Sequence, residues 1–246
     1  MYIDKTRTLD DWSAANDKKL VTTAANNSII GATVKAVESD IVATEMEYAV
    51  VKDNGVKNDY SIDFELINSK AYHDKFEGLT SHKDVDEAMY KQAAKIFKHR
   101  TGSEYEDIAM LDARTGKLLV ENTSASGEDK FKAGLTKKQA AYLESIKKEF
   151  EILHNHPGST PPSLADIEGL FIRPLAIAST ILGHDGTLYR MVKKKVYSNI
   201  SKFLEKVFDE VKGAHPDWPK KLVEIHATDV AIEILCKDGY MDYIKR

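Results

Sequence analysis

The spacing of apolar positions predicts two helices in the first 150 residues. Between about residue 84 and residue 102, apolar residues recur at the interval of a helical turn, and the pattern ends near His99 and Gly102. These apolar positions are Val85, Met89, Ala93, Ile96 and Phe97. A second helix is predicted over about 136–149, where Thr136 is a suitable N-cap residue.

Short apolar runs and alternating patterns predict strands between and after these helices. DIAMLD and KLLVE, on either side of ARTG, predict a β-hairpin over 106–121. FEILHNH, residues 150–156, predicts a strand that Pro157 stops. LAIASTIL and TLYRMVKK predict two more strands, joined by a turn over residues 183–186. Because strands and helices alternate along the chain, the expected fold class is α/β.

The two ends of the chain differ from this central part. The N-terminal part is rich in Thr, Val, Ala, Asn and Asp, and its short runs around the Asp53-Asn54-Gly55 turn predict strands, without any motif that indicates a function. Near the C-terminus, helices are predicted over about 196–213 and 220–237. The chain is therefore expected to comprise a β-rich extension (1–66), a central α/β domain (67–195) and a C-terminal helical segment (196–246).

Composition narrows the class of protein. Its 35 basic and 39 acidic residues give a net charge of −4, which argues against a dedicated nucleic-acid binder, since such proteins usually carry a basic face. Cys236 is the single cysteine, so an internal disulfide and a CxxC metal site are excluded. The polar, acidic N-terminus does not resemble a secretory signal, and no apolar run approaches the length of a membrane span. We therefore expect a protein that is cytoplasmic or carried within a larger particle.

The stretch HNHPGSTPPSLAD, residues 154–166, concentrates the candidate chemistry. Side chains alternate along a strand, so His154 and His156 should point the same way, and two imidazoles at that spacing can approach one metal ion. The proline-rich turn that follows predicts a sharp return of the chain to a helix opened by Ser163. Asp166, one turn into that helix, can then supply a third ligand. Three protein ligands and one open position are typical of a catalytic zinc site, where the open position holds a water of lowered pKa.

Each part of this stretch also has an ordinary structural interpretation. Ser163 and Asp166 are spaced as a capping box, which needs no metal. A histidine pair on a strand often serves packing alone. Similarly, His184-Asp185 could indicate a metal-dependent phosphohydrolase, but Asp-Gly between two strands first predicts a hairpin turn. The combination of a histidine-bearing strand, a tight proline turn and a helix opened by Ser-x-x-Asp favours the metal site.

His154-Asn155-His156-Pro157, followed by Ser163 and Asp166, resembles the signature of the JAMM (MPN-plus) zinc metalloproteases. It looks most like the bacterial branch with His-Asn-His-Pro, which includes RadC-type proteins and JAMM domains of phage and mobile-element proteins. The resemblance covers about residues 85–195. The family pattern usually has seven residues between the second histidine and the serine, whereas this chain has six.

The resemblance implies a cytidine-deaminase-like mixed sheet flanked by helices for the central domain, which would then be a JAMM-like metallohydrolase. It implies a zinc ion (Zn2+) held by His154, His156 and Asp166. It also implies that Ser163 stabilises the tetrahedral intermediate and that an upstream glutamate acts as general base. The tripeptide His-Asn-His is not the HNH nuclease signature, whose three residues are dispersed.

Two glutamates are candidates for that base. Glu104 and Glu106 would share one face if the strand over DIAMLD has already begun there. Resemblance to the phage-associated members favours Glu106, whereas the spacing in RadC-type members favours Glu104. Each can also be a solvated carboxylate at a strand edge. We expect Glu106 to be the base.

These residues predict a zinc-dependent metallopeptidase or isopeptidase that hydrolyses an amide bond in a protein or peptide substrate. The alternative is a non-catalytic role, in which a JAMM fold serves as a binding module for the head or tail assembly partners of a phage or mobile-element particle. Membrane and nucleic-acid partners are not expected. The predicted location is cytoplasmic or virion-associated.

Overall fold

The structure is a computed structural model that describes residues 60–123 and 134–246. The strands predicted before residue 60 lie outside the described residues. The helices are α2 (Phe64–Ile67), α3 (Lys70–Asp74), α4 (Lys83–Arg100), α5 (Lys137–Ile146), α6 (Leu164–Phe171), α7 (Ile200–Ala214) and α8 (Lys220–Lys237). The strands are β1 (Ile108–Asp112), β2 (Leu118–Asn122), β3 (Phe150–His156), β4 (Ala176–Gly183), β5 (Leu188–Lys193) and β6 (Met241–Lys245).

The strands form one mixed six-stranded sheet in the order β2-β1-β3-β4-β5-β6. β3 and β4 are parallel, and the other neighbouring pairs are antiparallel. A parallel pair requires a crossover connection, and here the crossover contains α6. The carboxyl end of β3 and the start of α6 are therefore joined by the proline-rich loop, which makes this end of the sheet the place where the motif comes together.

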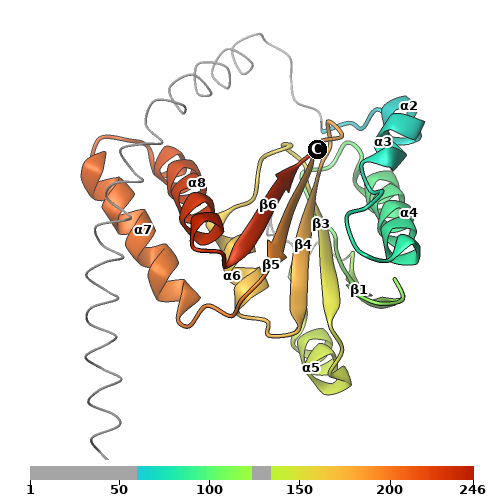
Figure 1. Ribbon diagram of the computed structural model, residues 1–246. Coiled ribbons are helices and arrows are strands. Elements are labelled where there is room, and N and C mark those ends of the chain that lie inside the picture. The colour runs from blue at the N-terminus through green and yellow to red at the C-terminus, as the bar shows by residue number, and fades with distance from the viewer. Residues whose placement is uncertain (1–59, 124–133) are drawn as a thin grey trace, which may run out of the picture.

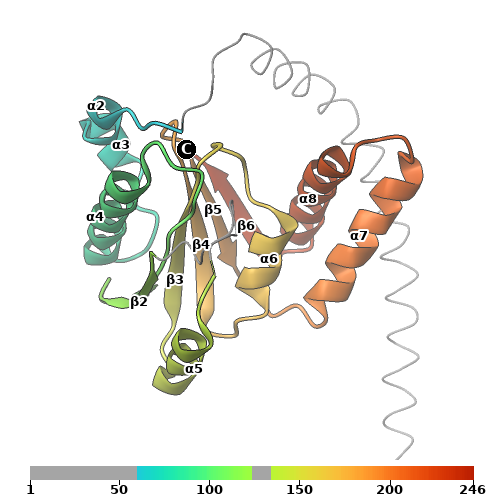
Figure 2. The same ribbon diagram turned by 180° about the vertical axis from the view of Figure 1, so that it is seen from behind.

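Helices cover both faces of the sheet, as Figures 1 and 2 show. α6, α7 and α8 bury one face in the larger hydrophobic core, and α2, α3 and α4 bury the other face in a second core. The two cores follow from the alternation of side chains along the strands: Ile152 of β3 belongs to the first and Leu153 to the second. Within the described ranges, no helix combines the length and the apolar character needed to cross a membrane.

The α/β class and most of the predicted elements are confirmed. α4 and α5 lie where the helical pattern placed them, and Thr136 caps α5 in a full capping box with Gln139. β1 and β2 form the predicted hairpin, β3 ends at His156 before Pro157, and β4 and β5 are joined by the predicted turn. These elements have strong local signals, namely caps, prolines and tight turns, so their positions depend little on tertiary contacts.

Two predictions were wrong in part. The described end of the N-terminal extension contains a short helix, α2, in which the Asp63 side chain accepts hydrogen bonds from the amides of Glu65 and Leu66, and the predicted strands lie before it, outside the described residues. The segment after residue 196 contains α7 and α8 as predicted, but its last residues form a strand, β6, paired with β5. The hairpin strand begins at Ile108 instead of residue 106, so Glu106 precedes the strand.

A buried ion pair connects the centre of the sheet. On the face covered by α4, the Arg190 guanidinium donates two hydrogen bonds to the Glu151 carboxylate at 2.8 and 2.9 Å, and a third to the Thr180 hydroxyl. Both charged side chains are almost completely buried. Removal of the carboxylate would leave the buried positive charge of the guanidinium without a partner, which is strongly destabilising. The fold therefore depends on both side chains together.

We expect Glu151→Ala to lower the free energy of unfolding by about 3–5 kcal/mol, the usual cost of leaving one partner of a buried ion pair alone. Urea denaturation followed by circular dichroism measures this change. Asp242→Ala is the matched control, because its ion pair with Lys194 joins β6 to the residue just after β5 and both side chains are about half exposed, so it should change the midpoint little. Equal effects of the two substitutions would contradict the conclusion that the buried Glu151–Arg190 pair contributes more to stability than an exposed ion pair.

Candidate metal centre

Both histidines lie at the carboxyl end of β3, on the face that α6 covers. Phe150 and Ile152 are on that face, and they pack into the same core as the buried side chains of α6. His154 and His156 follow at the next alternate positions, and both are buried. Pro157 has no N–H to continue the ladder, and the chain then turns back to α6. The strand therefore presents two imidazoles to the first turn of the helix.

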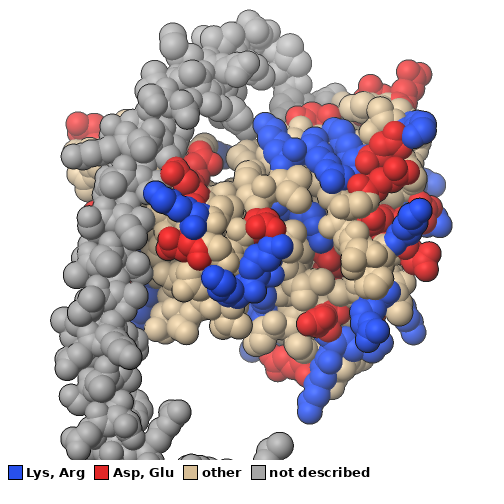
Figure 3. Space-filling view, in the orientation of Figure 1, with Lys and Arg blue, Asp and Glu red and all other residues tan. Residues whose placement is uncertain are grey.

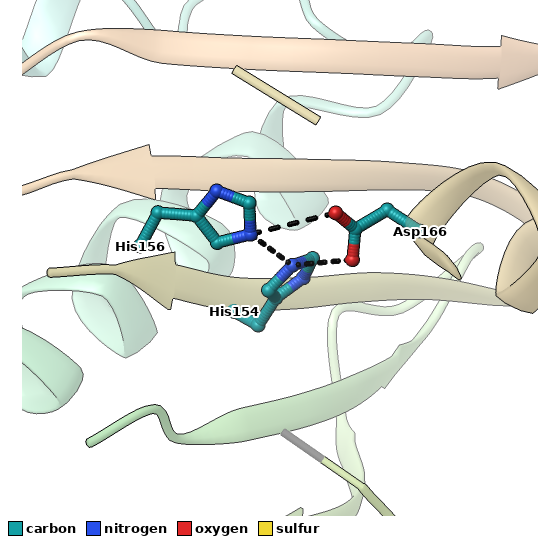
Figure 4. A group of neighbouring side chains, drawn as sticks. All are labelled: His154, His156 and Asp166. Carbon is teal, nitrogen blue, oxygen red and sulfur yellow. Dashed lines mark hydrogen bonds and ion pairs between the residues drawn. The ribbon is translucent and has the colours of Figure 1, made fainter. Parts of the chain in front are cut away.

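The three ligand candidates meet at distances that fit one metal ion (Figure 4). Nε2 of His154 lies 3.2 Å from Nε2 of His156. The Asp166 carboxylate lies 3.1 Å from Nε2 of His154 and 3.5 Å from Nε2 of His156. Ligand atoms about 2.0–2.1 Å from a tetrahedral zinc ion lie roughly 3.3–3.4 Å from one another. The three separations lie on both sides of this value, with Oδ1 of Asp166 near His154 and Oδ2 near His156. Two imidazoles and a carboxylate this close together fit a zinc ion.

The orientation of His156 is fixed from the other side of its ring. Its Nδ1 atom lies 2.9 Å from the backbone oxygen of Thr160 and 3.1 Å from the Thr160 hydroxyl. When Nδ1–H donates to that carbonyl oxygen, the lone pair of Nε2 faces Asp166 and His154, as a metal ligand requires. Nδ1 of His154 has no hydrogen-bond partner among the described residues. The loop after Pro157 therefore orients one of the two imidazoles.

Asp166 serves the helix and the histidines at the same time. Its Oδ2 atom accepts hydrogen bonds from the backbone N–H and the hydroxyl of Ser163, both at 2.7 Å, and Oγ of Ser163 accepts from the amide of Asp166. This is the complete capping box of α6. The other carboxylate oxygen is the one that lies 3.1 Å from His154. The capping box and the metal site are therefore compatible.

The charges of the site shift the pKa values of its groups. Burial alone would lower the pKa of His156, but the hydrogen bond and charge of Asp166, together with the charge of Glu106, outweigh it and raise the pKa to about 9. Burial would raise the pKa of Asp166, but the two histidines hold it well below its usual value. Without a metal, the site therefore contains a carboxylate and at least one proton that a cation can replace.

Of the two candidate bases, Glu106 is the one whose charge acts on the site. It is 8% exposed, whereas Glu104 is half-buried. The β1–β3 ladder pairs Ile108 with His154, and in an antiparallel register the residue two before Ile108 faces the residue two after His154. Glu106 is thus aligned with His156, while the position of Glu104 falls beyond the end of β3. Its carboxylate contributes to the raised pKa of His156.

Several supporting residues were not found from the sequence. Thr160 carries no motif, and only the fold of the loop brings it to His156. Asn155 belongs to the His-Asn-His-Pro signature, yet its side chain lies on the opposite face of the sheet and forms hydrogen bonds with the backbone of residues 105 and 107. His184 is in the predicted turn and contacts Asn155. The alternation of β3 could have indicated that Asn155 faces away from the histidines; the other contacts depend on tertiary structure.

A second group of possible ligands, His73, Asp74 and Glu77, lies near the surface on α3 and in the turn after it. His73 is paired with Glu87, and Asp74 with Lys70. Because two of its three side chains already form ion pairs, we do not propose this group as a metal centre.

We expect about one zinc ion per chain in protein purified without chelator, as measured by elemental analysis. Asp166→Asn should retain less zinc than Ser163→Ala, because only Asp166 is a proposed ligand, whereas both substitutions remove part of the capping box. The two variants are therefore matched for their effect on the helix. Equal retention in both would indicate that Asp166 is a cap only, and protein without a divalent metal would contradict the site.

The metal-free protein should lose stability as the pH rises from about 6.5 to about 9. The unfolded chain has an ordinary histidine pKa near 6.5. A raised folded pKa means that protonated His156 stabilises the fold fully below that value, and this contribution disappears as the pH passes about 9. Urea denaturation with chelator present should show this decline, and His156→Gln should remove it. A decline of equal size in His156→Gln would contradict this prediction.

Figure 3 shows that acidic and basic side chains are interspersed on the face it presents.

Comparison of the chain with protein-family models, with curated proteins and with solved structures found no match.

Proposed function

We propose that this protein is a zinc-dependent metallopeptidase or isopeptidase of the JAMM type, which hydrolyses an amide bond in a protein or peptide. The observation that carries the proposal is the set of mutual distances of 3.1 to 3.5 Å among His154, His156 and Asp166, with the charge of Glu106 acting on the same place. Three protein ligands of this kind are typical of catalytic zinc sites.

His154, His156 and Asp166 would hold the metal through Nε2, Nε2 and a carboxylate oxygen. When bound, the zinc ion polarises a carbonyl oxygen and lowers the pKa of a water to near 7. Histidine must be neutral to act as a ligand, so the proton that Asp166 and Glu106 hold on His156 has to leave when the metal binds. We therefore expect metal affinity to increase with pH up to about 9.

Glu106 is the proposed general base. A carboxylate that is largely buried and positioned next to the ligand set can accept a proton from the attacking water on one oxygen and deliver it to the leaving amine. Glu106 does not belong to the group of proposed ligands, so the proposal assigns it proton transfer and not metal binding. This division assigns metal binding to β3 and α6, and proton transfer to the segment before β1.

Ser163 is proposed to stabilise the negative charge that develops on the substrate carbonyl oxygen. Its side chain is exposed at the start of α6, and its hydroxyl proton is donated to Asp166. Rotation about the Cβ–Oγ bond would direct that proton to a substrate oxygen instead. The N-terminus of a helix favours negative charge as well, which makes this position suitable for an oxyanion.

A JAMM-like fold is part of the proposal. The order of elements in the chain supports it: a hairpin preceded by the candidate base, then the strand with both histidines, then the helix opened by Ser163 and Asp166. β6 extends the same sheet, and α7 and α8 pack into the same hydrophobic core, so the 196–246 segment would be part of the metallohydrolase domain.

We expect Glu106→Gln to keep zinc and the fold, and to slow amide hydrolysis by about 10² to 10⁴, the usual contribution of a positioned proton acceptor. The probes are a quenched fluorescent peptide library and a set of lysine-isopeptide-linked peptides, with wild-type protein as the reference. Glu104→Gln is the matched control, because it removes a carboxylate two residues away whose position lies past the end of β3, and it should retain activity.

Loss of hydrolysis in Glu104→Gln with full activity in Glu106→Gln would move the base two residues upstream. If zinc-loaded wild-type protein cleaves none of these peptides, the hydrolase proposal fails, and a non-catalytic binding role becomes the better explanation.

A further inference from the structure

We propose that Asn155 is a positioning residue that holds the Glu106 carboxylate beside the metal centre. This inference rests on the proposed function, because it concerns the proposed base. Asn155 lies between the two histidines in the sequence, but on β3 its side chain points to the opposite face of the sheet. It therefore cannot be a ligand, and its role has to be found on that other face.

The side-chain amide of Asn155 binds the backbone on both sides of Glu106. Its Oδ1 atom accepts a hydrogen bond from the N–H of Asp107 at 2.8 Å, and its Nδ2 atom donates to the carbonyl oxygen of Tyr105 at 3.2 Å. These two backbone groups flank residue 106. A single side chain thus fixes the peptide units before and after the proposed base.

The surrounding contacts determine the orientation of this amide. A backbone N–H only donates and a carbonyl oxygen only accepts, so Oδ1 must face Asp107 and Nδ2 must face Tyr105. The second proton of Nδ2 is directed to Nε2 of His184 at 3.0 Å, and Nδ1 of His184 donates to the carbonyl oxygen of Tyr60 at 2.8 Å. Burial lowers the pKa of His184, which favours the neutral ring that this arrangement needs.

Asn155 replaces the backbone pairing that ends at the start of β1. The β1–β3 ladder extends no further than the pair Ile108 and His154. Beyond it, the 105–107 segment would have to be held by other groups to keep Glu106 aligned with His156. The Asn155 amide supplies one donor and one acceptor, as a paired strand would. It is completely buried, and burying an amide is favourable only when its hydrogen bonds are made.

The same segment is anchored from α4. Asp107 accepts a hydrogen bond from Nε of Arg100 at 2.6 Å, and its other oxygen lies 2.6 Å from Nδ1 of His99. These contacts draw the Asp107 side chain toward α4, so alternation along the chain directs the Glu106 side chain to the face of the histidines. Asn155 and Asp107 together set the position of Glu106, and Asn155 is the connection to the strand that carries the ligands.

The test uses protein loaded with Co2+, which accepts the same ligands as zinc and whose visible absorption responds to ionisation at the metal. Glu106→Gln removes a negative charge next to the site, so the pH midpoint of the spectral change should move down by about one unit. Asn155→Ala should move it in the same direction by at least half as much. In the double variant, the shift should equal that of Glu106→Gln alone, because Asn155 acts through Glu106.

Thr180→Val is the matched control. Thr180 is also buried on the face toward α4, in the strand next to β3, and this change removes its hydrogen bond from Arg190 without touching the 105–107 segment. It should leave the midpoint in place. If Asn155→Ala does not fold cooperatively, Asn155→Ser takes its place, because a short hydroxyl cannot reach both backbone groups.

The outcomes separate the inference from the proposed function. If the pH midpoint moves in Glu106→Gln but stays at the wild-type value in the Asn155 variant, the role of Asn155 is wrong and the proposed function still stands. If Co2+ binds and Glu106→Gln leaves the midpoint unchanged, Glu106 is not the base and both fail. If the midpoint shifts in both single variants and the double variant shifts no further than Glu106→Gln, the result supports the inference.

Discussion

The contact between the two imidazole nitrogens is the constraint on which the site depends. Nε2 of His154 and Nε2 of His156 lie 3.2 Å apart in a buried place, with a carboxylate beside them. Two lone pairs at that distance repel unless a proton or a metal ion lies between them. The arrangement of the two imidazoles therefore favours a bound proton or metal ion between them. The raised pKa of His156 is the result when that cation is a proton. A metal would take the same place, and its binding energy would add to the stability of the fold.

The capping interactions that begin α6 also place the third candidate ligand, Asp166. Ser163 and Asp166 close a capping box, which fixes the carboxylate at the first turn of α6. The parallel pairing of β3 with β4 brings that turn back to the end of β3. Oδ2 of this carboxylate accepts the capping hydrogen bonds and lies 3.5 Å from Nε2 of His156, while Oδ1 lies 3.1 Å from Nε2 of His154. The capping box of Ser-x-x-Asp and the proposed role of Asp166 as a metal ligand therefore do not exclude each other.

The alternation of side chains along β3 places the candidate ligands on one face of the sheet and the residues that hold the strand in position on the other. His154 and His156 face α6, whereas Glu151, Leu153 and Asn155 face α4. On the α4 side, a buried ion pair and a chain of hydrogen bonds through Asn155 keep the strand and the segment before β1 in place. Rigid support of this kind matters for a site whose proposed ligands and proposed base must keep their mutual geometry. Substitutions that weaken such a site need not touch the proposed ligands.

The sequence by itself determined the elements that have strong local signals and the group of residues that forms the candidate centre. Helical periodicity, caps and prolines located α4, β3 and the start of α6, and the spacing of His154, His156 and Asp166 indicated a shared ligand set, because a strand, a tight turn and a capped helix leave few arrangements. Tertiary structure decided the rest. Met241–Lys245 form a strand by pairing with the edge of β5, and the β1–β3 register aligns Glu106, instead of Glu104, with His156. Pairing between distant strands is set by long-range packing, which no local pattern in the chain records.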